Sequence, residues 1–182
     1  MNEISQISPR DSLPETIATA RLRMAAPVMA DLAELVPLAN NDNVTRWTAR
    51  MPFPYGQEDG IDFIETFVTA PTERPYSIRN EAGAFIGIVS LMFNEEQPPE
   101  IGYWLGEPFW GQGYGGEAAA GLIGAARASG RFEVIGAKVI AGNAASLRIL
   151  EKAGFVRTGE ETGDCGRNKG KRIVHLKLEL VP

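Results

Sequence analysis

The sequence has very few of the side chains that build disulfides and metal centres. Among its 182 residues there is one cysteine, Cys165, and one histidine, His175. A single cysteine excludes an internal disulfide and is compatible with a reducing compartment. These two residues also fall short of the several Cys and His ligands that a zinc site uses. We therefore predict no metal site and a cytoplasmic location.

Two further absences argue against membranes and nucleic acids as partners. No apolar run approaches the roughly 20 residues that a helix needs to cross a bilayer. Residues 1–16 carry Glu3, Asp11 and Glu15 and lack an apolar block, which is untypical of a secretory signal. Basic residues are in the minority, with 18 Lys and Arg against 23 Asp and Glu and a net charge of −5. A nucleic-acid binder, by contrast, presents a basic face.

What remains is the composition of an ordinary folded protein. Hydrophobic residues make up 44% of the chain and charged residues 23%, which excludes a disordered protein. The length fits one domain rather than two. Residues 1–16 are polar and contain Pro9 and Pro14, so we expect a loose leader there and a single domain over residues 17–182.

Apolar spacing and turn residues divide the chain into strands and helices. Strands are expected at 20–25, 76–79, 84–93, 100–105, 132–140, 155–160 and 171–180, and helices at 27–39, 57–69, 115–129 and 144–153. The turn-rich tetrapeptide Asn-Glu-Ala-Gly joins the second and third strands as a hairpin. This order predicts a mixed α/β chain with a mostly antiparallel first half.

The most informative stretch is the glycine cluster Trp110-Gly-Gln-Gly-Tyr-Gly-Gly-Glu117, between a strand and a helix. Four glycines in six residues leave the backbone unshielded, so several N–H groups can point into one concavity. The following helix adds its free N–H groups and the positive end of its dipole. The pattern predicts an anion cradle suited to a pyrophosphate.

Three interpretations of this cluster compete. It could be a flexible turn, because glycines alone are weak evidence. It could be a dinucleotide site, since Gly111, Gly113 and Gly116 spell G-x-G-x-x-G. Against that, residues 106–110 separate it from the preceding strand, and the earlier strands look antiparallel rather than parallel. The third interpretation, a coenzyme A pyrophosphate loop, tolerates such a connection.

An ordered set of motifs bears on this choice. It consists of Thr19-Ala-Arg-Leu-Arg23, Glu100-Ile-Gly-Tyr-Trp-Leu105, Phe109-Trp-Gly-Gln-Gly-Tyr-Gly-Gly-Glu-Ala118, Asn143-Ala-Ala-Ser146 and Glu151-Lys-Ala-Gly-Phe155. In this order the motifs resemble the GCN5-related N-acetyltransferase (GNAT) superfamily, and more closely its branch of ribosomal-protein N-terminal (RimJ/RimL-like) acetyltransferases. The resemblance spans roughly residues 19–180. Trp110 stands where the family's loop usually opens with Arg or Gln. Tryptophan at this position looks like a trait of the RimJ/RimL-like branch.

The resemblance implies a GNAT-like α/β (α+β) fold, in which helices flank a mixed, mostly antiparallel central sheet that is split in the middle. It implies an acetyl-CoA-dependent N-acyltransferase of the EC 2.3.1 type. The acetyl group would pass directly, within a ternary complex, to a primary amine. A protein or peptide N-terminus is the favoured acceptor, with a small amine as the alternative. We expect a monomer or a homodimer.

The resemblance also assigns residues to the acetyl-CoA site. The backbone of Trp104 and Leu105 would pair with the pantetheine arm where the strand splays from its neighbour. The remaining positions implied for the cofactor are Gly111, Gln112, Gly113, Tyr114, Gly115, Gly116, Asn143 and Ser146. Asn143 also precedes a helix, where an N-cap role is expected in any case.

Two residues are candidates for catalysis. The resemblance implies that Glu100 is the base that takes the amine proton through a water, and that Ser146 protonates the departing thiolate. Each also has a plain alternative, since Glu100 could be a solvated residue at a strand start and Ser146 a first-turn residue that satisfies a free N–H. Glu107 and Glu117 are weaker candidates for the base. The general-acid tyrosine of many relatives is replaced by Leu150, so that mechanism does not carry over.

The acceptor would meet an aromatic, proline-rich segment in the first half of the chain. The residues implied are Trp47, Phe53 and Tyr55, although such a segment could instead be a hydrophobic lid that packs on the core. Two rival functions are a non-catalytic acyl-CoA-binding or sensing module on the same fold and, less favoured, a dinucleotide-binding domain.

Overall fold

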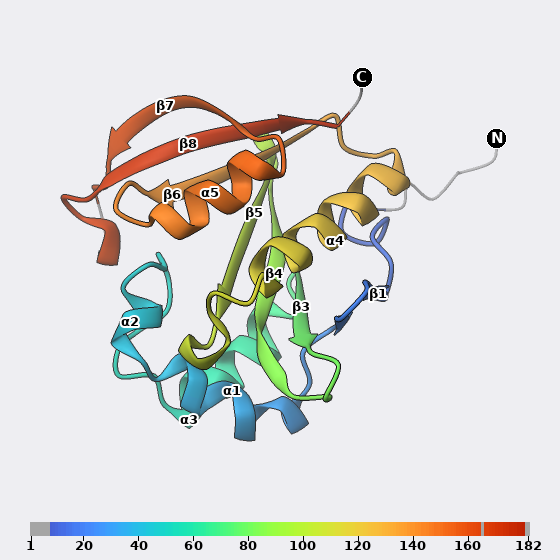
Figure 1. Ribbon diagram of the computed structural model, residues 1–182, viewed down its shortest axis with the longest axis vertical. Helices are drawn as coiled ribbons and strands as arrows, with labels where there is room; N and C mark the ends of the chain where they lie inside the picture. The colour runs from blue at the N-terminus through green and yellow to red at the C-terminus, as the bar shows by residue number, and fades with distance from the viewer. Residues whose placement is uncertain (1–7, 165, 181–182) are drawn as a thin grey trace.

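The centre of the molecule is one mixed sheet covered by helices on both faces. The computed structural model describes residues 8–164 and 166–180, so Cys165 lies outside the described residues. The sheet has eight strands in the order β1-β2-β3-β4-β5-β6-β8-β7 (Figure 1). Neighbouring strands are antiparallel except β5 and β6, which are parallel. The mostly antiparallel, mixed sheet is therefore confirmed.

The first half of the chain supplies one edge of the sheet and the helices of one face. Its elements are β1 (Thr16–Ala18), β2 (Arg23–Ala25), a 3₁₀ turn (Met29–Asp31), α1 (Leu32–Ala39), α2 (Asp42–Thr45), α3 (Gln57–Asp62), a π-helical turn (Phe63–Phe67), β3 (Glu73–Arg79) and β4 (Phe85–Asn94). The second half supplies β5 (Gln97–Leu105), a 3₁₀ turn (Glu107–Phe109), α4 (Tyr114–Ser129), β6 (Val134–Ile140), α5 (Ala144–Lys152), β7 (Val156–Thr162), a 3₁₀ turn (Gly166–Asn168) and β8 (Arg172–Glu179).

The strand predicted at 20–25 is confirmed only over residues 23–25, where β2 forms the second strand of a short hairpin. β1 pairs with β2, and the N–H of Thr19 donates to the carbonyl of Leu22 over 3.0 Å across the turn. The helix predicted at 57–69 also changes character, because α-helical bonding stops at Asp62 and a π-helical turn continues it. The four-residue helix α2 was not predicted at all, since a segment this short carries no periodic signal.

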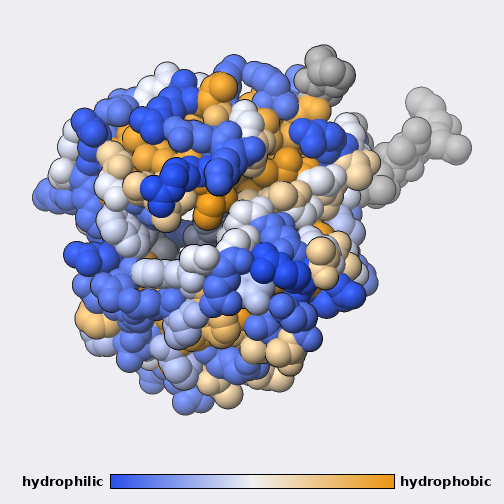
Figure 2. All heavy atoms as spheres, viewed as in Figure 1, coloured by the Kyte–Doolittle hydropathy of each residue, from blue (hydrophilic) through white to orange (hydrophobic). Residues whose placement is uncertain are grey.

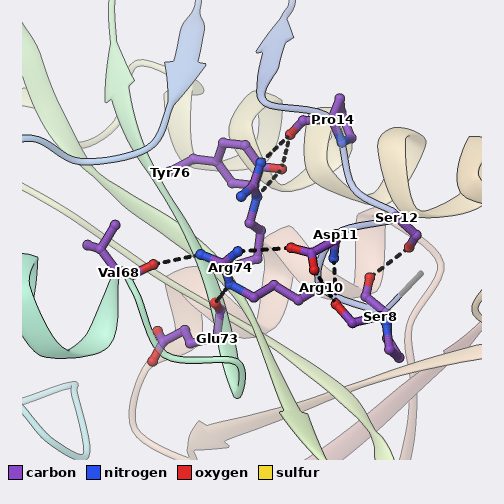
Figure 3. A network of polar contacts seen from close by, with 10 residues as sticks. Ser8, Arg10, Asp11, Ser12, Pro14, Val68, Glu73, Arg74 and Tyr76 are labelled. Atoms are coloured by element: carbon purple, nitrogen blue, oxygen red, sulfur yellow. Dashed lines mark hydrogen bonds and ion pairs between the residues drawn. The ribbon is translucent and has the colours of Figure 1, made fainter. Parts of the chain in front are cut away.

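The leader expected over residues 1–16 is not loose where the structure describes it. Leu13 is 3% exposed and belongs to the main core. The guanidinium of Arg10 donates to the carbonyls of Val68, over 2.7 Å, and Glu73, over 2.9 Å, and the hydroxyl of Tyr76 donates to Pro14 (Figure 3). These contacts tie the segment from residue 8 onward to β3 and to the end of the π-helical turn. Polar composition alone could not reveal them.

The sheet is split between β5 and β6. Their ladder contains a single residue pair, Glu100 with Gly136. Beyond this pair the two strands diverge, whereas β5 stays paired with β4 as far as Leu105 opposite Gly87. This geometry confirms the centrally split sheet implied by the sequence resemblance.

Two hydrophobic cores flank the sheet. The larger one lies under α4 and α5 and includes Tyr103 and Leu105 of β5 at its margin. The smaller one lies under α1 and includes Trp104, whose ring is 6.2 Å from that of Phe85. Because side chains alternate along a strand, Glu100 shares the face of Trp104. No helix among residues 8–164 and 166–180 is long and apolar enough to cross a membrane.

Candidate active site

The glycine cluster forms an open cradle at the start of α4. Gly111 and Gly113 have φ values of 74° and 83°, a left-handed region in which L side chains are strained. A Cβ built at Gly111 or at Gly116 would meet no atom within 4 Å, so both positions face open space. The first main-chain hydrogen bond of α4 runs from Glu117 to Gly113. The N–H groups that precede it are free to bind an anion.

Side chains from the β1–β2 hairpin hold this cradle in place. The carboxylate of Glu117 accepts hydrogen bonds from Thr19 Oγ1 over 2.5 Å and from Arg21 N and Nε over 2.8 and 2.7 Å. Arg21 also donates to the carbonyl of Gln112 over 3.0 Å, and its guanidinium lies 4.5 Å from the centre of the Tyr114 ring. Glu117 is thus occupied with fastening the loop, which argues against the weak base role considered for it.

The same contacts set the ionisation of Glu117. Burial alone would raise the pKa of this carboxyl, but the hydrogen bonds from Thr19 and Arg21 outweigh it and hold the pKa below its ordinary value. The carboxylate therefore stays charged at neutral pH. The loop is fastened by a charge-assisted cluster rather than by glycines alone.

The cradle offers an anion its backbone rather than its side chains. Tyr114 is 6% exposed and its hydroxyl donates to Glu81 over 3.2 Å, so only its main chain can serve the cradle. The amide of Gln112 donates back to the carbonyl of Pro108. The indole N–H of Trp110 donates to the carbonyl of Leu105 over 2.8 Å. Trp110 therefore braces the end of β5.

The open edge of β5 belongs to Tyr103 and Leu105 rather than to Trp104. The N–H of Gly106 bonds to Ile86 on β4, and a Cβ at Gly87 would collide with the carbonyl oxygen of Trp104. Because backbone groups alternate in direction along a strand, those of Trp104 are used by β4 and those of Tyr103 and Leu105 face the split. The backbone role predicted for Leu105 suits this placement, whereas that of Trp104 does not.

Asn143 and Ser146 lie at the start of α5, across the split from β5. Asn143 caps the helix, because its Oδ1 accepts the N–H of Ser146 over 3.2 Å. The Oγ of Ser146 lies 3.0 Å from the hydroxyl of Tyr103. Sequence analysis missed Tyr103; the only signal was its place in Glu-Ile-Gly-Tyr-Trp-Leu, two residues from the apolar Ile101 and Leu105 on the same face.

Glu100 does not join Ser146. It stands at the single β5–β6 pair, on the opposite face of the sheet, and its carboxylate forms an ion pair with Lys138 over 3.0 Å. It lines a cavity of about 250 Å³ together with Met92, Phe93, Asn94, Gln97, Pro98 and Lys138. The two residues predicted as catalytic therefore approach the split from its two faces.

The aromatic segment predicted to meet the acceptor extends across the split on the Glu100 face. We call residues 42–56 the lid. A Cβ built at Gly142, just before α5, would lie 3.4 Å from the ring of Trp47. At the other side Arg50 binds the buried carboxylate of Glu73 over 2.9 and 3.0 Å and touches Met92 Sδ at 3.3 Å. The lid thus reaches from β4 to the start of α5.

The β7–β8 connection fastens the lid from outside. Lys171 Nζ donates to the carbonyl of Arg46 over 3.0 Å, and Arg167 contacts Asp42 and Thr45. Between the part of the molecule that carries α5 and the part that carries α2, Figure 2 shows a hollow in the surface.

Of the three residues predicted to meet the acceptor, two are accessible. Trp47 is 37% exposed and Phe53 47% exposed, whereas Tyr55 is 6% exposed. Tyr55 packs in the smaller core with Leu35 and Phe85, and burial raises its pKa to about 12. The structure therefore corrects the substrate role predicted for Tyr55, whose buried ring anchors the end of the lid in the smaller core.

Comparisons with known proteins agree with this geometry. A family model described as "Acetyltransferase (GNAT) domain" matches residues 21–156. The chain is 29% identical over 172 residues to the uncharacterized N-acetyltransferase p20 of Bacillus licheniformis, covering 92% of this chain and 96% of that relative.

Solved structures share the fold at lower identity. RimL, the ribosomal L7/L12 alpha-N-protein acetyltransferase in complex with coenzyme A, matches with a TM-score of 0.80 at 18% identity, covering 91% of this chain and 98% of that one. Spermidine N-acetyltransferase from Vibrio cholerae, in complex with CoA and spermine, matches with a TM-score of 0.77 at 16% identity, covering 89% and 97%.

The dinucleotide interpretation of the glycines fails at this point. The strands before the cluster, β3 to β5, are antiparallel, whereas a dinucleotide fingerprint requires a parallel βαβ unit. The matched family model covers most of the chain, and the matched structures share its overall fold. The chain belongs to the GNAT acetyltransferase family and is an N-acetyltransferase that uses acetyl-CoA.

Proposed function

We propose that this enzyme acetylates the free amino terminus of a peptide or protein, by direct transfer within a ternary complex. The observation that carries the proposal is the split itself, which has one residue pair at its base and a different set of groups on each face. The glycine cradle and Ser146 lie on the α4–α5 face. Glu100 and the lid lie on the other. Two substrates can therefore meet in the split without displacing one another.

The donor side is suited to hold acetyl-CoA along its length. The N–H groups at the start of α4 would bind the pyrophosphate. The backbone groups of Tyr103 and the N–H of Leu105, whose carbonyl is taken by Trp110, would pair with the pantetheine arm as an added strand would. This path leads along β5 from the cradle towards Ser146 and Asn143. Acetyl-CoA supplies the activated acetyl group, and the chain supplies its orientation.

The acceptor side offers one carboxylate close to the split. An amine must lose a proton to react, because amines are mostly charged at neutral pH. Glu100 can accept this proton directly or through a water in the adjoining cavity, while its ion pair with Lys138 orients the carboxylate. Their separation of 3.0 Å means that an incoming ammonium competes with Lys138 for the same oxygen atoms.

The charges around the lid favour a peptide over a polyamine. Arg50 and Lys138 face carboxylates, but Arg46 lies over the Trp47 ring at 5.8 Å and Lys171 donates to a backbone carbonyl. The lid contains two arginines, Arg46 and Arg50, against one carboxylate, Asp42, which leaves one net positive charge. With Lys171 beside it, this surface repels a polycation and attracts an acidic segment. We infer that preferred acceptors have Asp or Glu close behind the free amino terminus, with a small amine as the second candidate.

A covalent acetyl-enzyme is disfavoured by the surroundings of Ser146. A nucleophilic serine needs a neighbouring base, and its neighbour here is the hydroxyl of Tyr103, whose pKa burial raises to about 12. A phenol with such a pKa holds its proton at neutral pH. Direct attack of the amine on the acetyl group therefore suits these residues better than a two-step route.

The first test is thermal unfolding with acetyl-CoA, CoA and NAD in turn. A ligand at 100 times its dissociation constant stabilises the fold by roughly 2.7 kcal/mol, which shifts the melting temperature visibly. We expect shifts with acetyl-CoA and CoA and none with NAD. A shift with NAD alone would contradict the assignment of the cradle.

The second test separates acceptor classes by CoA release and product mass. Four probes suffice: a peptide with an acidic second and third residue, the same peptide with lysines there, an N-terminally blocked peptide with an internal lysine, and spermidine. We expect the acidic peptide to react fastest. Spermidine reacting faster than both free-amino-terminus peptides would contradict the proposal.

The role of Glu100 is tested with Glu100→Gln, matched to Glu160→Gln on β7. Glu160 also faces a basic residue, Arg172, but lies on the β7–β8 hairpin rather than on β5. Loss of transfer only in the Glu100 variant, with acetyl-CoA binding intact, supports the base role and excludes a non-catalytic binding module. Equal activity of both variants would remove Glu100 from the mechanism.

We infer further that the enzyme works in the cytoplasm, because its single cysteine suits a reducing compartment. One chain carries both faces of the site described above, so a monomer is sufficient for the reaction. A homodimer is compatible with the same site. Light scattering of the purified protein distinguishes the two states.

A further inference from the structure

A pair of hydroxyl groups lies inside the split. The hydroxyl of Tyr103, on β5, is 3.0 Å from the Oγ of Ser146 and 3.4 Å from its carbonyl oxygen, in the first turn of α5. A carbonyl can only accept, and either hydroxyl can donate to the other. The contact links the strand that offers the open edge to the helix on the far side of the split.

The ring of Tyr103 is fixed by three elements. A Cβ at Gly115, in the first turn of α4, would be 4.0 Å from the tyrosine ring and 3.2 Å from Ile149 on α5. The ring is therefore confined where β5, α4 and α5 converge, and its hydroxyl can reach few positions other than Ser146. A confined ring with a single polar tip places that tip at low entropic cost.

The pKa values of the two hydroxyl groups decide whether they can protonate a thiolate or only donate hydrogen bonds to it. Burial raises the pKa of Tyr103 to about 12, with the hydrogen bond between Tyr103 and Ser146 acting in the opposite direction. A thiol has a pKa of about 8.5. Moving the tyrosine proton to a thiolate is then uphill by more than about a thousandfold, and an aliphatic hydroxyl is a still weaker acid. Donating a hydrogen bond carries no such penalty.

We propose that Tyr103 is a positioning residue, whose O–H donates to Ser146 Oγ and so directs the serine's own O–H at the sulfur of coenzyme A. The pair stabilises the departing thiolate by hydrogen bonding and does not protonate it. This inference rests on the proposed function, because it requires the sulfur to lie beside Ser146. The resemblance implies that Ser146 protonates the thiolate. In this inference Ser146 donates only a hydrogen bond to it.

The atoms balance without a proton from either hydroxyl. The amine nitrogen forms a bond to the acetyl carbon, and the bond from that carbon to sulfur breaks with its electron pair left on sulfur. The surplus proton of the amine passes to Glu100 or to water. Coenzyme A leaves as a thiolate and takes its proton from solvent. Tyr103 and Ser146 end the reaction as they began it.

The test measures the ionisation of bound coenzyme A, which needs no acceptor and no turnover. The thiol of CoA bound to the full-length enzyme is titrated by the ultraviolet absorbance of its thiolate, with the acetyl-CoA complex as the blank. We expect the wild type to lower the thiol pKa below that of free CoA by about one unit, a tenfold shift. Ser146→Ala should abolish the shift, and Tyr103→Phe should remove a large part of it.

Three comparisons make the result specific. The double variant Tyr103→Phe with Ser146→Ala should match Ser146→Ala, because the tyrosine acts only through the serine. Tyr76→Phe also removes a buried hydroxyl, the one that donates to Pro14, and should leave the thiol pKa as in wild type. Threonine at position 146 keeps a hydroxyl and should retain part of the shift.

The outcomes separate this inference from the proposed function. If CoA does not bind the wild type, the donor assignment fails and this inference with it. If CoA binds and its thiol pKa is unchanged in the wild type, or equal in wild type and Tyr103→Phe, the inference alone is overturned. The inference would also be overturned if Ser146→Ala kept a lowered thiol pKa and the double variant lost it, since the tyrosine would then act on the sulfur directly.

Discussion

The proposed donor face and the proposed acceptor face of the split are built from different parts of the chain and by different means. The donor face is local and made of backbone, because its cradle is formed by residues 111–116 and the start of the following helix. The acceptor face is assembled from distant segments. Its lid is held by Glu73, Met92 and Lys171, which lie on three separate elements.

This difference teaches where each kind of specificity resides. A backbone cradle binds any ligand of the right anionic shape. Side-chain contacts between distant elements can be exchanged without disturbing the cradle. The same fold can therefore accept different amines by changing its lid, while it keeps its acyl donor.

The largest effect is expected from Gly111→Ala on the donor face. Its φ of 74° strains any L residue, and the added Cβ would occupy the open cradle. Gly83→Ala is the matched control, because Gly83 has a φ of 79° and equally free space in a distant turn. Both should lose about 1–2 kcal/mol of stability. Calorimetry should show acetyl-CoA affinity falling at least about tenfold in the Gly111 variant only; equal affinities would break the contrast between the faces.

The cradle is also held by a long-range contact between Glu117 and the β1–β2 hairpin. The Glu117→Gln variant tests how much this contact stabilises the fold. The pKa of Glu117 is held below its ordinary value of 4.5, so its contribution to stability is present above that value and is lost as the pH falls through the lowered pKa. At neutral pH the variant should be less stable by about 1–3 kcal/mol. Denaturant unfolding should show the difference shrinking as the pH drops below 4.5. A difference independent of pH would mean that the charge is not what holds the loop.

On the acceptor face, Trp47→Ala should separate the two substrates. The ring packs over Gly142, so its loss opens the lid beside the start of α5. We expect kcat/KM for a peptide acceptor to fall about tenfold, or roughly 1.4 kcal/mol, and acetyl-CoA affinity to stay within about twofold. Met29→Ala removes a side chain of similar exposure far from the lid and controls for lost apolar surface. A weakened acetyl-CoA affinity would show that the faces are not independent.

The smallest effect is expected from Lys171→Met, which frees one outer fastening of the lid. Hydrogen bonds of exposed charged groups contribute little, so the KM of the peptide acceptor should rise only about two- to threefold. Lys177→Met, which removes a lysine paired with Glu179 on the same strand, should leave that KM unchanged. Measuring this KM at low and high salt would sharpen the result. The KM for an acidic peptide should depend on salt most strongly in the wild type, which keeps the charge of Lys171.

The same contrast explains how much the sequence could reveal. The cradle, α4 and the capped start of α5 were predictable, because glycines, an N-cap asparagine and their spacing are local signals. The pairing of Arg10 with the carbonyl of Glu73 and of Tyr103 with Ser146 spans 63 and 43 residues. No local pattern specifies such contacts. The burial of Tyr55 was missed for the same reason, since an aromatic residue between prolines fits a surface lid and a core equally well.

The single pairing between β5 and β6 has a consequence for how the protein behaves at high concentration. Unpaired strand edges on a protein surface recruit strands from other molecules and so promote aggregation. Here the two unpaired stretches face each other across the split, with α5 over one opening and the lid over the other. The unpaired edges of β5 and β6 therefore point into the split, where only a slender, extended molecule can reach them. The gap is thereby closed to edge-to-edge pairing with the sheets of other molecules, while a single extended chain end can still enter it.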